Sequence, residues 1–127
     1  MIKTDILIIG AGPTGLFAVF EAGLLKLKCH LIDSLPMPGG QCAEIYPKKP
    51  IYDIPSHPEI LAGDLVKNLE QQIAPFQPGY TLGKVQFQLK SQQTTSLLLL
   101  QTRGPNIKLL LLLSPVDSGH LSLESLL

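Results

Sequence analysis

Three glycines in the stretch Gly10-Ala11-Gly12-Pro13-Thr14-Gly15 constrain the fold of this chain more than any other feature. They follow a short apolar run, residues 5–9, and precede a stretch whose residues suit a helix. A strand, a tight turn and a helix start, in this order, form the setting in which the G-x-G-x-x-G spacing binds a dinucleotide. There Gly10 permits the turn, Gly12 lets backbone approach a pyrophosphate, and Gly15 lets the helix pack closely on the strand. The anion then lies at the positive N-terminal end of the helix.

An acidic residue closes the next apolar run. Asp33 ends the stretch His30-Leu31-Ile32-Asp33, near the distance of about 20 residues after the glycines at which a carboxylate accepts ribose hydroxyls. The alternatives are that Asp33 is a surface loop acid and that the glycines form a turn without a ligand. The strand before the glycines and the acid after them favour the dinucleotide interpretation.

The first 33 residues predict a β-α-β unit. Apolar, β-branched runs at 4–9 and 28–33 are typical of buried parallel strands, and the apolar spacing within 14–26 predicts the helix between them. The crossover is expected to be right-handed. A second, amphipathic helix is predicted over 59–74, with Ser56 as its cap and Glu59 completing a capping box.

Composition limits the classes of function. Lys and Arg together number 10, and so do Asp and Glu, so charge gives no argument for a nucleic-acid or membrane-surface partner. Cys29 and Cys42 are too far apart for a C-x-x-C redox pair and are interpreted as reduced thiols of a cytoplasmic protein. No basic segment precedes the first apolar run, so no signal peptide is expected. The leucine runs at 97–100 and 109–113 are shorter than the ~20 residues that a membrane-spanning helix needs.

A loop rich in turn formers follows Asp33. Its paired glycines, Gly39 and Gly40, allow backbone to approach a ligand closely, and the amide of Gln41 can both donate and accept hydrogen bonds. Tyr46 lies on a proline-stiffened connection, where its ring can cover a flat heterocycle or plug the sheet edge, and the residues alone leave both open. His57 is interpreted as a loop residue and not as a catalyst.

Residues 4–83 resemble the FAD-binding start of the thioredoxin-reductase-like ferredoxin–NADP⁺ reductases. The stretches that carry the resemblance are Ile8-Ile9-Gly10-Ala11-Gly12-Pro13-Thr14-Gly15-Leu16, Leu31-Ile32-Asp33-Ser34-Leu35-Pro36, Gly39-Gly40-Gln41, Tyr46-Pro47, Tyr52-Asp53-Ile54-Pro55 and Leu65-Val66-Lys67-Asn68-Leu69. The resemblance implies an α/β fold: a Rossmann-like FAD-binding domain with a parallel sheet, incomplete in this chain.

The same resemblance implies which residues bind the cofactor. The FAD pyrophosphate would be held by the glycine turn, which comprises Gly10, Gly12, Pro13, Thr14 and Gly15. Asp33 would bind the adenosine ribose, and Gln41 and Tyr46, with Gly40 beside them, would contact the flavin side. Hydride transfer from NADPH to a flavin needs no protein acid or base, so no catalytic residue and no metal ligand is assigned.

The activity implied by the family is oxidoreduction, with electrons passing from NADPH through FAD to ferredoxin or flavodoxin, in an enzyme that tends to form homodimers. Three alternatives stay open. The chain can be the FAD-binding half of a dithiol reductase, whose C-x-x-C would lie in a later domain. It can also be an NAD-binding Rossmann domain, or a non-enzymatic nucleotide-binding module with a leucine-rich partner surface.

The resemblance ends after Gly83, which divides the chain into an FAD-binding portion, 1–83, and a divergent tail, 84–127. The tail is rich in Leu, Gln, Thr and Ser, has little strand alternation, and is expected to be irregular or poorly ordered. Codons allowed for 114–127, read from their third base, can spell a glycine-rich segment of the kind the family shows, which suggests a frameshift near residues 83 and 84. A divergent but genuine tail is the alternative. With the NADPH domain absent, we expect the isolated chain to hold FAD weakly and not to turn over NADPH.

Overall fold

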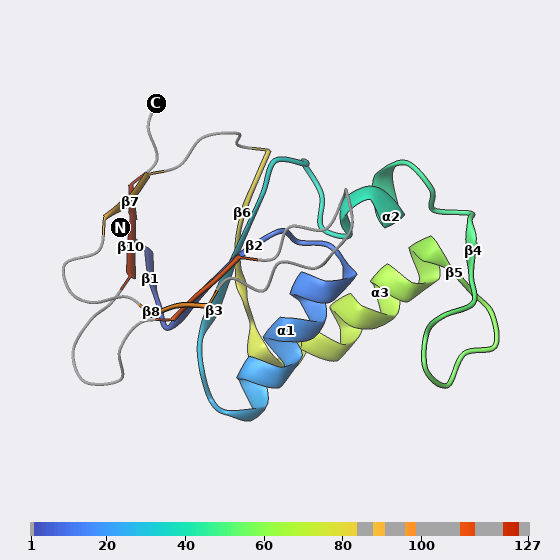
Figure 1. The fold of residues 1–127 in the computed structure, drawn as a ribbon, viewed down its shortest axis with the longest axis horizontal. Helices are drawn as coiled ribbons and strands as arrows, with labels where there is room; N and C mark the ends of the chain where they lie inside the picture. The colour runs from blue at the N-terminus through green and yellow to red at the C-terminus, as the bar shows by residue number, and fades with distance from the viewer. Residues whose placement is uncertain (1, 84–87, 91–95, 99–109, 114–120, 125–127) are drawn as a thin grey trace.

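The fold is built on a parallel sheet with two helices packed on one of its faces (Figure 1). The structure is a computed structural model that describes residues 2–83, 88–90, 96–98, 110–113 and 121–124. Strands β2 (Ile6–Ile9), β3 (Cys29–Asp33) and β6 (Gly79–Leu82) are parallel and stand in the order β6-β3-β2. Helix α1 (Pro13–Leu24) connects β2 to β3, and helix α3 (Ala62–Ile73) precedes β6. This arrangement confirms the predicted Rossmann-like α/β fold with a parallel sheet.

The remaining elements are short. Helix α2 (Gly40–Glu44) and strands β4 (Pro50–Ile51) and β5 (Ile60–Leu61) lie between β3 and α3, and a 3-10 turn, Ala74–Phe76, follows α3. Strands β4 and β5 pair antiparallel as a separate two-stranded sheet (Figure 1).

Both the N-terminus and the described parts of the tail are strands. Strands β9 (Leu110–Leu113) and β8 (Ser96–Leu98) extend the main sheet antiparallel beyond β2, in the order β6-β3-β2-β9-β8. Strands β1 (Ile2–Thr4), β10 (Leu121–Glu124) and β7 (Gln88–Lys90) form a second antiparallel sheet. Most of the stretch expected to be irregular, residues 84–127, lies outside the described residues. Its described parts are the strands β7, β8, β9 and β10.

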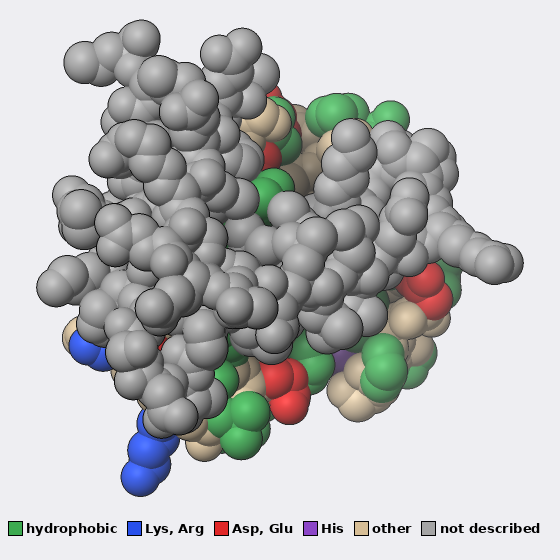
Figure 2. Space-filling model, turned by 60° about the vertical axis from the view of Figure 1, so that its left-hand side comes forward, with side chains coloured by type: hydrophobic (Ala, Val, Ile, Leu, Met, Phe, Trp, Pro, Cys, Tyr) green, Lys and Arg blue, Asp and Glu red, His purple; other side chains and the backbone are tan. Residues whose placement is uncertain are grey.

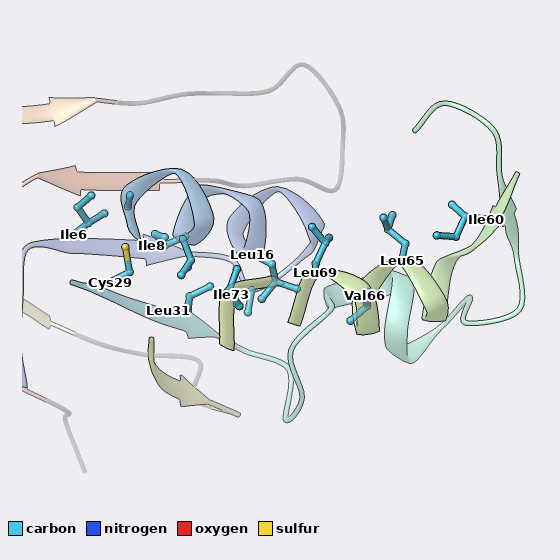
Figure 3. Close-up of a cluster of buried hydrophobic side chains, with 13 residues drawn as sticks. Ile6, Ile8, Leu16, Cys29, Leu31, Ile60, Leu65, Val66, Leu69 and Ile73 are labelled. Carbon is cyan, nitrogen blue, oxygen red and sulfur yellow. The ribbon is translucent and has the colours of Figure 1, made fainter. Parts of the chain in front are cut away.

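The hydrophobic core lies between the sheet and the two helices (Figure 3). Ile6 and Ile8 of β2 point to the same face as Leu31 of β3, because alternate residues of a strand share a face. They meet Leu16 of α1 and Ile73 of α3, whose side chains are almost completely buried. Leu7 and Ile32, which point to the opposite face, are buried as well. Burial on both faces explains why these strands read as continuous apolar runs.

Helix α1 is held to the end of α3 by aromatic side chains. Phe20 meets Phe76 edge to face, with ring centroids 5.9 Å apart. A Cβ atom on Gly23 would overlap the ring of Phe76, so the ring lies directly against the backbone of α1. The absence of a side chain at residue 23 therefore sets how closely the 3-10 turn approaches α1.

The sequence prediction was wrong about the start of α3, which it placed at residue 59. The helix begins at Ala62, after an N-cap residue, Leu61, that makes no side-chain cap hydrogen bond. Ser56 has a φ of 67° and lies in the loop before β5, so it caps nothing. Buried Ile60 pairs with Ile51 across β4 and β5, and this pairing replaces the first turn that the capping-box pattern predicted. The apolar stripe holds further along, where Leu65, Leu69 and Ile73 are buried.

The strand predicted over 4–9 is interrupted at Asp5, which separates β1 from β2. The Asp5 carboxylate accepts a hydrogen bond from the Lys28 N–H at 2.8 Å, and the Thr4 hydroxyl donates to the Lys28 carbonyl at 2.8 Å. Side-chain hydrogen bonds of this kind compete with regular strand pairing. They also tie the beginning of β2 to the beginning of β3.

Truncating the core should destabilise the fold far more than truncating the exposed face of the same helix. Leu16→Ala removes a completely buried side chain of α1, and we expect a loss of about 2–5 kcal/mol in the free energy of unfolding. Leu24→Ala, on the same helix, changes a side chain that is 60% exposed and should cost less than about 0.5 kcal/mol. Urea denaturation followed by circular dichroism measures both, and equal losses would contradict the placement of α1.

A buried histidine should make stability depend on pH. His30 of β3 shares a 2.8 Å hydrogen bond between Nε2 and the Thr81 hydroxyl of β6, and burial lowers the pKa of His30 below its usual value of 6.5. Below pH 6.5 the unfolded chain therefore binds a proton that the folded chain does not. The free energy of unfolding is thus highest above pH 6.5 and falls as the pH decreases below it. For one proton the slope cannot exceed about 1.4 kcal/mol per pH unit.

Urea midpoints measured between pH 8 and pH 5 test this expectation. His30→Asn should flatten the acid side of the profile, whereas the wild-type slope should persist in His57→Gln, a change in the loop between β4 and β5. An unchanged slope in His30→Asn would show that other groups cause the acid loss.

Candidate dinucleotide-binding site

The glycine turn, residues 10–15, runs from the end of β2 through the first turn of α1. Gly10 has a φ of 108°, a conformation that favours glycine, and its N–H donates to the Ile32 carbonyl of β3 at 2.8 Å. Gly15 is buried, and a Cβ atom there would overlap the Gly10 carbonyl oxygen and lie 3.3 Å from Cγ2 of Ile8. The helix thus approaches the strand closely enough that only glycine fits at residue 15.

The space in front of α1 is open at Gly12. Gly12 is the N-cap residue of α1, and an added Cβ atom would have no heavy atom within 4 Å. Pro13 occupies the first helical position, where its missing N–H costs nothing, and the first-turn N–H groups of Thr14 and Gly15 have no acceptor within the helix. Open space beside unsatisfied donors, at the positive end of a helix with no acid in its first turn, suits a phosphate group.

Asp33 ends β3 beside this turn. Its Oδ2 accepts a hydrogen bond from the Ala11 N–H at 2.7 Å, and its Oδ1 accepts from the Leu35 N–H at 3.0 Å. The carboxylate is partly buried and lies at the carboxyl ends of β2 and β3, where open α/β sheets bind their ligands. The structure therefore brings Asp33 and the glycine turn together.

The glycine pair Gly39 and Gly40 contacts the glycine turn. The Gly39 N–H donates to the Ala11 carbonyl at 2.7 Å, and Gly39 has a φ of 106°. A Cβ atom on Gly40 would lie 3.2 Å from the Cα atom of Gly12. The loop before α2 thus borders the space in front of α1, and Gly40 lies beside the glycine turn.

Gln41 and Tyr46 lie at the start of α2 and just after its end. Gln41 is exposed on α2, and its carbonyl accepts the N–H groups of Ile45 and Tyr46 at 2.9 and 3.1 Å. The Tyr46 ring is 52% exposed and has the Lys49 ammonium 5.5 Å from its centroid. An exposed ring does not plug the sheet edge, so the structure leaves Tyr46 accessible to a ligand. Within the described part of the chain, no hydrogen bond or aromatic contact joins it to the glycine turn.

One residue at the centre of the site, Ala11, was not singled out from the sequence, and Gly39 was singled out only as one of a pair that lets backbone approach a ligand. Ala11 carries both hydrogen bonds that join the turn to Asp33 and to Gly39, and its side chain is completely buried. The middle position of a G-x-G spacing gives no chemical signal, because only its backbone is used. Gly39 was visible in the pair Gly39-Gly40, whose contact with the turn depends on tertiary structure.

The cysteines of the described residues are free thiols. Burial, with Asp5 adding to it, raises the pKa of Cys29 to about 11. Burial also raises the pKa of Cys42, partly opposed by the positive charge of Lys49. Both thiols therefore stay protonated near neutral pH, which makes them poor nucleophiles.

The surface gives little sign of another binding chemistry. Within the described ranges, no group of three or more His, Cys, Asp or Glu side chains is placed to hold a metal ion, and no helix is long and apolar enough to span a bilayer. On the face drawn in Figure 2, the coloured acidic side chains are dispersed among hydrophobic ones, and the coloured Lys side chains lie toward one edge. The glycine turn therefore remains the candidate site.

Comparison with known proteins assigns the N-terminal part of the chain. Residues 8–64 match the profile of the NAD(P)-binding Rossmann-like domains. The chain is 83% identical over 84 residues to "Ferredoxin--NADP reductase 2" of Christiangramia forsetii and 71% identical over 104 residues to "Ferredoxin--NADP reductase 1" of the same organism. The N-terminal part of the chain is related to ferredoxin–NADP reductases. The relation extends to Flavobacterium johnsoniae, whose ferredoxin–NADP reductase is 64% identical over 104 residues.

These matches cover most of the chain but a small part of each relative. In the order given above, the three alignments cover 66%, 82% and 82% of the chain, yet only 24%, 30% and 30% of the respective reductases. The chain thus spans about 30% or less of the length of the ferredoxin–NADP reductases it matches.

Solved structures show the same fold at low sequence identity. Thioredoxin reductase from Streptococcus pyogenes superposes with a TM-score of 0.60 at 21% identity, covering 93% of this chain and 32% of that one. Thioredoxin reductase from Lactococcus lactis superposes with a TM-score of 0.57 at 23% identity, covering 70% of this chain and 30% of that one. These likenesses establish the fold and leave the activity to other arguments.

Gly12, the N-cap residue of α1, and Gly15, in its first turn, should respond differently to an added methyl group. Gly15→Ala drives a Cβ atom into the Gly10 carbonyl, and we expect a loss of about 1–3 kcal/mol in the free energy of unfolding. Gly12→Ala meets open space at a φ of −74°, so it should cost less than about 1 kcal/mol. Urea denaturation of the two variants side by side measures the difference, and a larger loss in Gly12→Ala would refute this geometry of the turn.

Proposed function

We propose that this chain is the FAD-binding N-terminal part of a ferredoxin–NADP⁺ reductase. The observation that carries the proposal is the open space at Gly12, bordered by Gly40 and facing the unsatisfied N–H groups of α1. That space accepts a pyrophosphate and would be filled by any side chain at residue 12. The high identity to ferredoxin–NADP reductases over these residues supports FAD as the dinucleotide.

The residues that would hold FAD fall into two groups. The pyrophosphate side comprises Gly10, Gly12, Pro13, Thr14 and Gly15, with Asp33 as the acceptor for the adenosine ribose. Gly40, Gln41 and Tyr46 would contact the flavin side, and the exposed Tyr46 ring is accessible for such a contact. When bound, FAD accepts hydride from a nicotinamide and passes electrons on singly, while the protein supplies binding and orientation.

The proposed activity belongs to the relatives at their full length. These 127 residues correspond to about 30% of those proteins, so for the residues themselves we propose FAD binding and no turnover of NADPH. We propose NADPH as the electron donor of the whole protein and ferredoxin or flavodoxin as its acceptor, in a homodimeric, cytoplasmic enzyme. The two free thiols agree with a reducing compartment.

A second candidate is the FAD-binding half of a dithiol reductase. The fold likeness to thioredoxin reductases favours it as the runner-up. It ranks below the ferredoxin-type reductase because those structures are 21–23% identical, whereas the ferredoxin–NADP reductases are 64–83% identical. A non-enzymatic nucleotide-binding module ranks third, and a partner that binds the chain without any nucleotide would favour it.

Filling the space at Gly12 should abolish most of the affinity for FAD. We expect the wild-type chain to bind FAD and Gly12→Ala to bind it at least about tenfold more weakly, because the new methyl group occupies the place where the pyrophosphate meets backbone. Equilibrium dialysis with free FAD measures both dissociation constants, and far-ultraviolet circular dichroism shows that the variant is folded.

The matched control is Gly63→Ala, the same change in the first turn of α3, where the glycine lies beside Pro47. It should bind FAD as the wild type does. Equal affinity in the wild type and Gly12→Ala would contradict binding at the glycine turn, and preference for NAD over FAD would move the chain to the plain NAD-binding Rossmann domains.

A further inference from the structure

The backbone N–H and carbonyl of Ala11 are both hydrogen-bonded within the protein. The Ala11 N–H donates to Asp33 Oδ2 at 2.7 Å, and the Ala11 carbonyl accepts from the Gly39 N–H at 2.7 Å. The Ala11 side chain is completely buried. The residue between the first two glycines therefore offers nothing to a ligand and instead joins the turn to two other loops.

The geometry of Asp33 indicates more than ribose binding. Each of its oxygens accepts one backbone N–H, from Ala11 and from Leu35. A carboxylate oxygen can accept a second hydrogen bond, so contact with ribose hydroxyls is still open to it. The two N–H contacts fix the carboxylate between the glycine turn and the loop after β3, and a hydrogen bond to a charged acceptor is about twice as strong as a neutral one.

The position of Ala11 connects this contact to the pyrophosphate site. Ala11 directly precedes Gly12, the residue with open space in front of α1. A shift of the Ala11 peptide would move the Gly12 backbone and the start of the helix, because consecutive peptide planes share a Cα atom. Asp33 is thus connected, through the backbone of Ala11, to the N–H groups at the start of α1 that we expect to bind a phosphate.

We propose that Asp33 is a positioning residue for the pyrophosphate site, acting through the Ala11 N–H, and that this role is separate from any contact with ribose hydroxyls. The proposal rests on the proposed dinucleotide-binding function. In this role the Asp33 side chain fixes the shape of the anion site without touching the phosphate itself. Gly39 holds the following peptide group through the Ala11 carbonyl.

Amide hydrogen exchange of the whole chain tests the hold on the turn. Asp33→Ala removes both acceptors, and we expect the Ala11 amide to exchange at least about tenfold faster than in the wild type. The matched control is Asp5→Ala, which removes a carboxylate that accepts the Lys28 N–H at 2.8 Å, at the opposite end of β2 and β3. It should leave the exchange of Ala11 within about threefold of wild type.

Nucleotides with and without ribose hydroxyls separate positioning from direct contact. ADP carries both the diphosphate and the hydroxyls, whereas 2′,3′-dideoxy-ADP carries only the diphosphate. Positioning predicts that Asp33→Ala weakens the binding of 2′,3′-dideoxy-ADP by about tenfold or more, and that Asp5→Ala changes neither affinity. If Asp33→Ala does not fold, Asp33→Asn takes its place with the same readouts. A neutral acceptor oxygen holds an N–H about half as strongly, so the same losses should appear at about threefold.

The outcomes are distinct. Unchanged exchange at Ala11, or a loss of affinity confined to ADP, overturns the proposal and leaves Asp33 as a ribose ligand alone. Faster exchange together with weaker binding of both nucleotides supports it. If the wild-type chain binds neither nucleotide, the proposed function fails, and the exchange of Ala11 alone then decides whether Asp33 positions the turn.

Discussion

The approach of α1 to the end of β2 is the contact on which the rest of the structure depends. Gly15 lies against the Gly10 carbonyl at a distance that admits no side chain. This contact fixes the angle at which α1 leaves the sheet and so determines how Leu16 enters the core beside Ile8. The same approach places the first turn, whose N–H groups have no acceptor within the helix, directly after Gly12 and the open space beside it. One close contact thus sets both the packing of the domain and the direction of its anion site.

The predictable part of the structure was the part whose signals are local. Continuous apolar runs and the spacing of the glycines located β2, α1 and β3. A strand buried on both faces and a tight turn each have a recognisable sequence pattern. The start of α3 was not predictable in this way. The pattern from Ser56 to Glu59 suits a capping box, but the burial of Ile60 against the rest of the core outweighs a cap worth about 1 kcal/mol.

The candidate site shows the same division. Gly10, Gly12, Gly15 and Asp33 could be singled out from spacing, and the structure brings them together at one end of the sheet. The role of Ala11 could not be anticipated, since it depends on where two loops place one N–H and one carbonyl. Tyr46 was ambiguous from the sequence because an aromatic residue on a loop suits either a ligand or a packing role, and its exposure argues against the packing role alone.

The contact between Gly23 and Phe76 has a consequence for how this sequence can vary. The ring of Phe76 occupies the volume that a side chain at residue 23 would need, and it also meets Phe20 edge to face. A side chain at residue 23 and the ring at residue 76, which are 53 positions apart, would therefore occupy the same space. A larger residue at 23 is compatible with the fold only where residue 76 is smaller, so drift at these two positions is coupled and must proceed through paired changes.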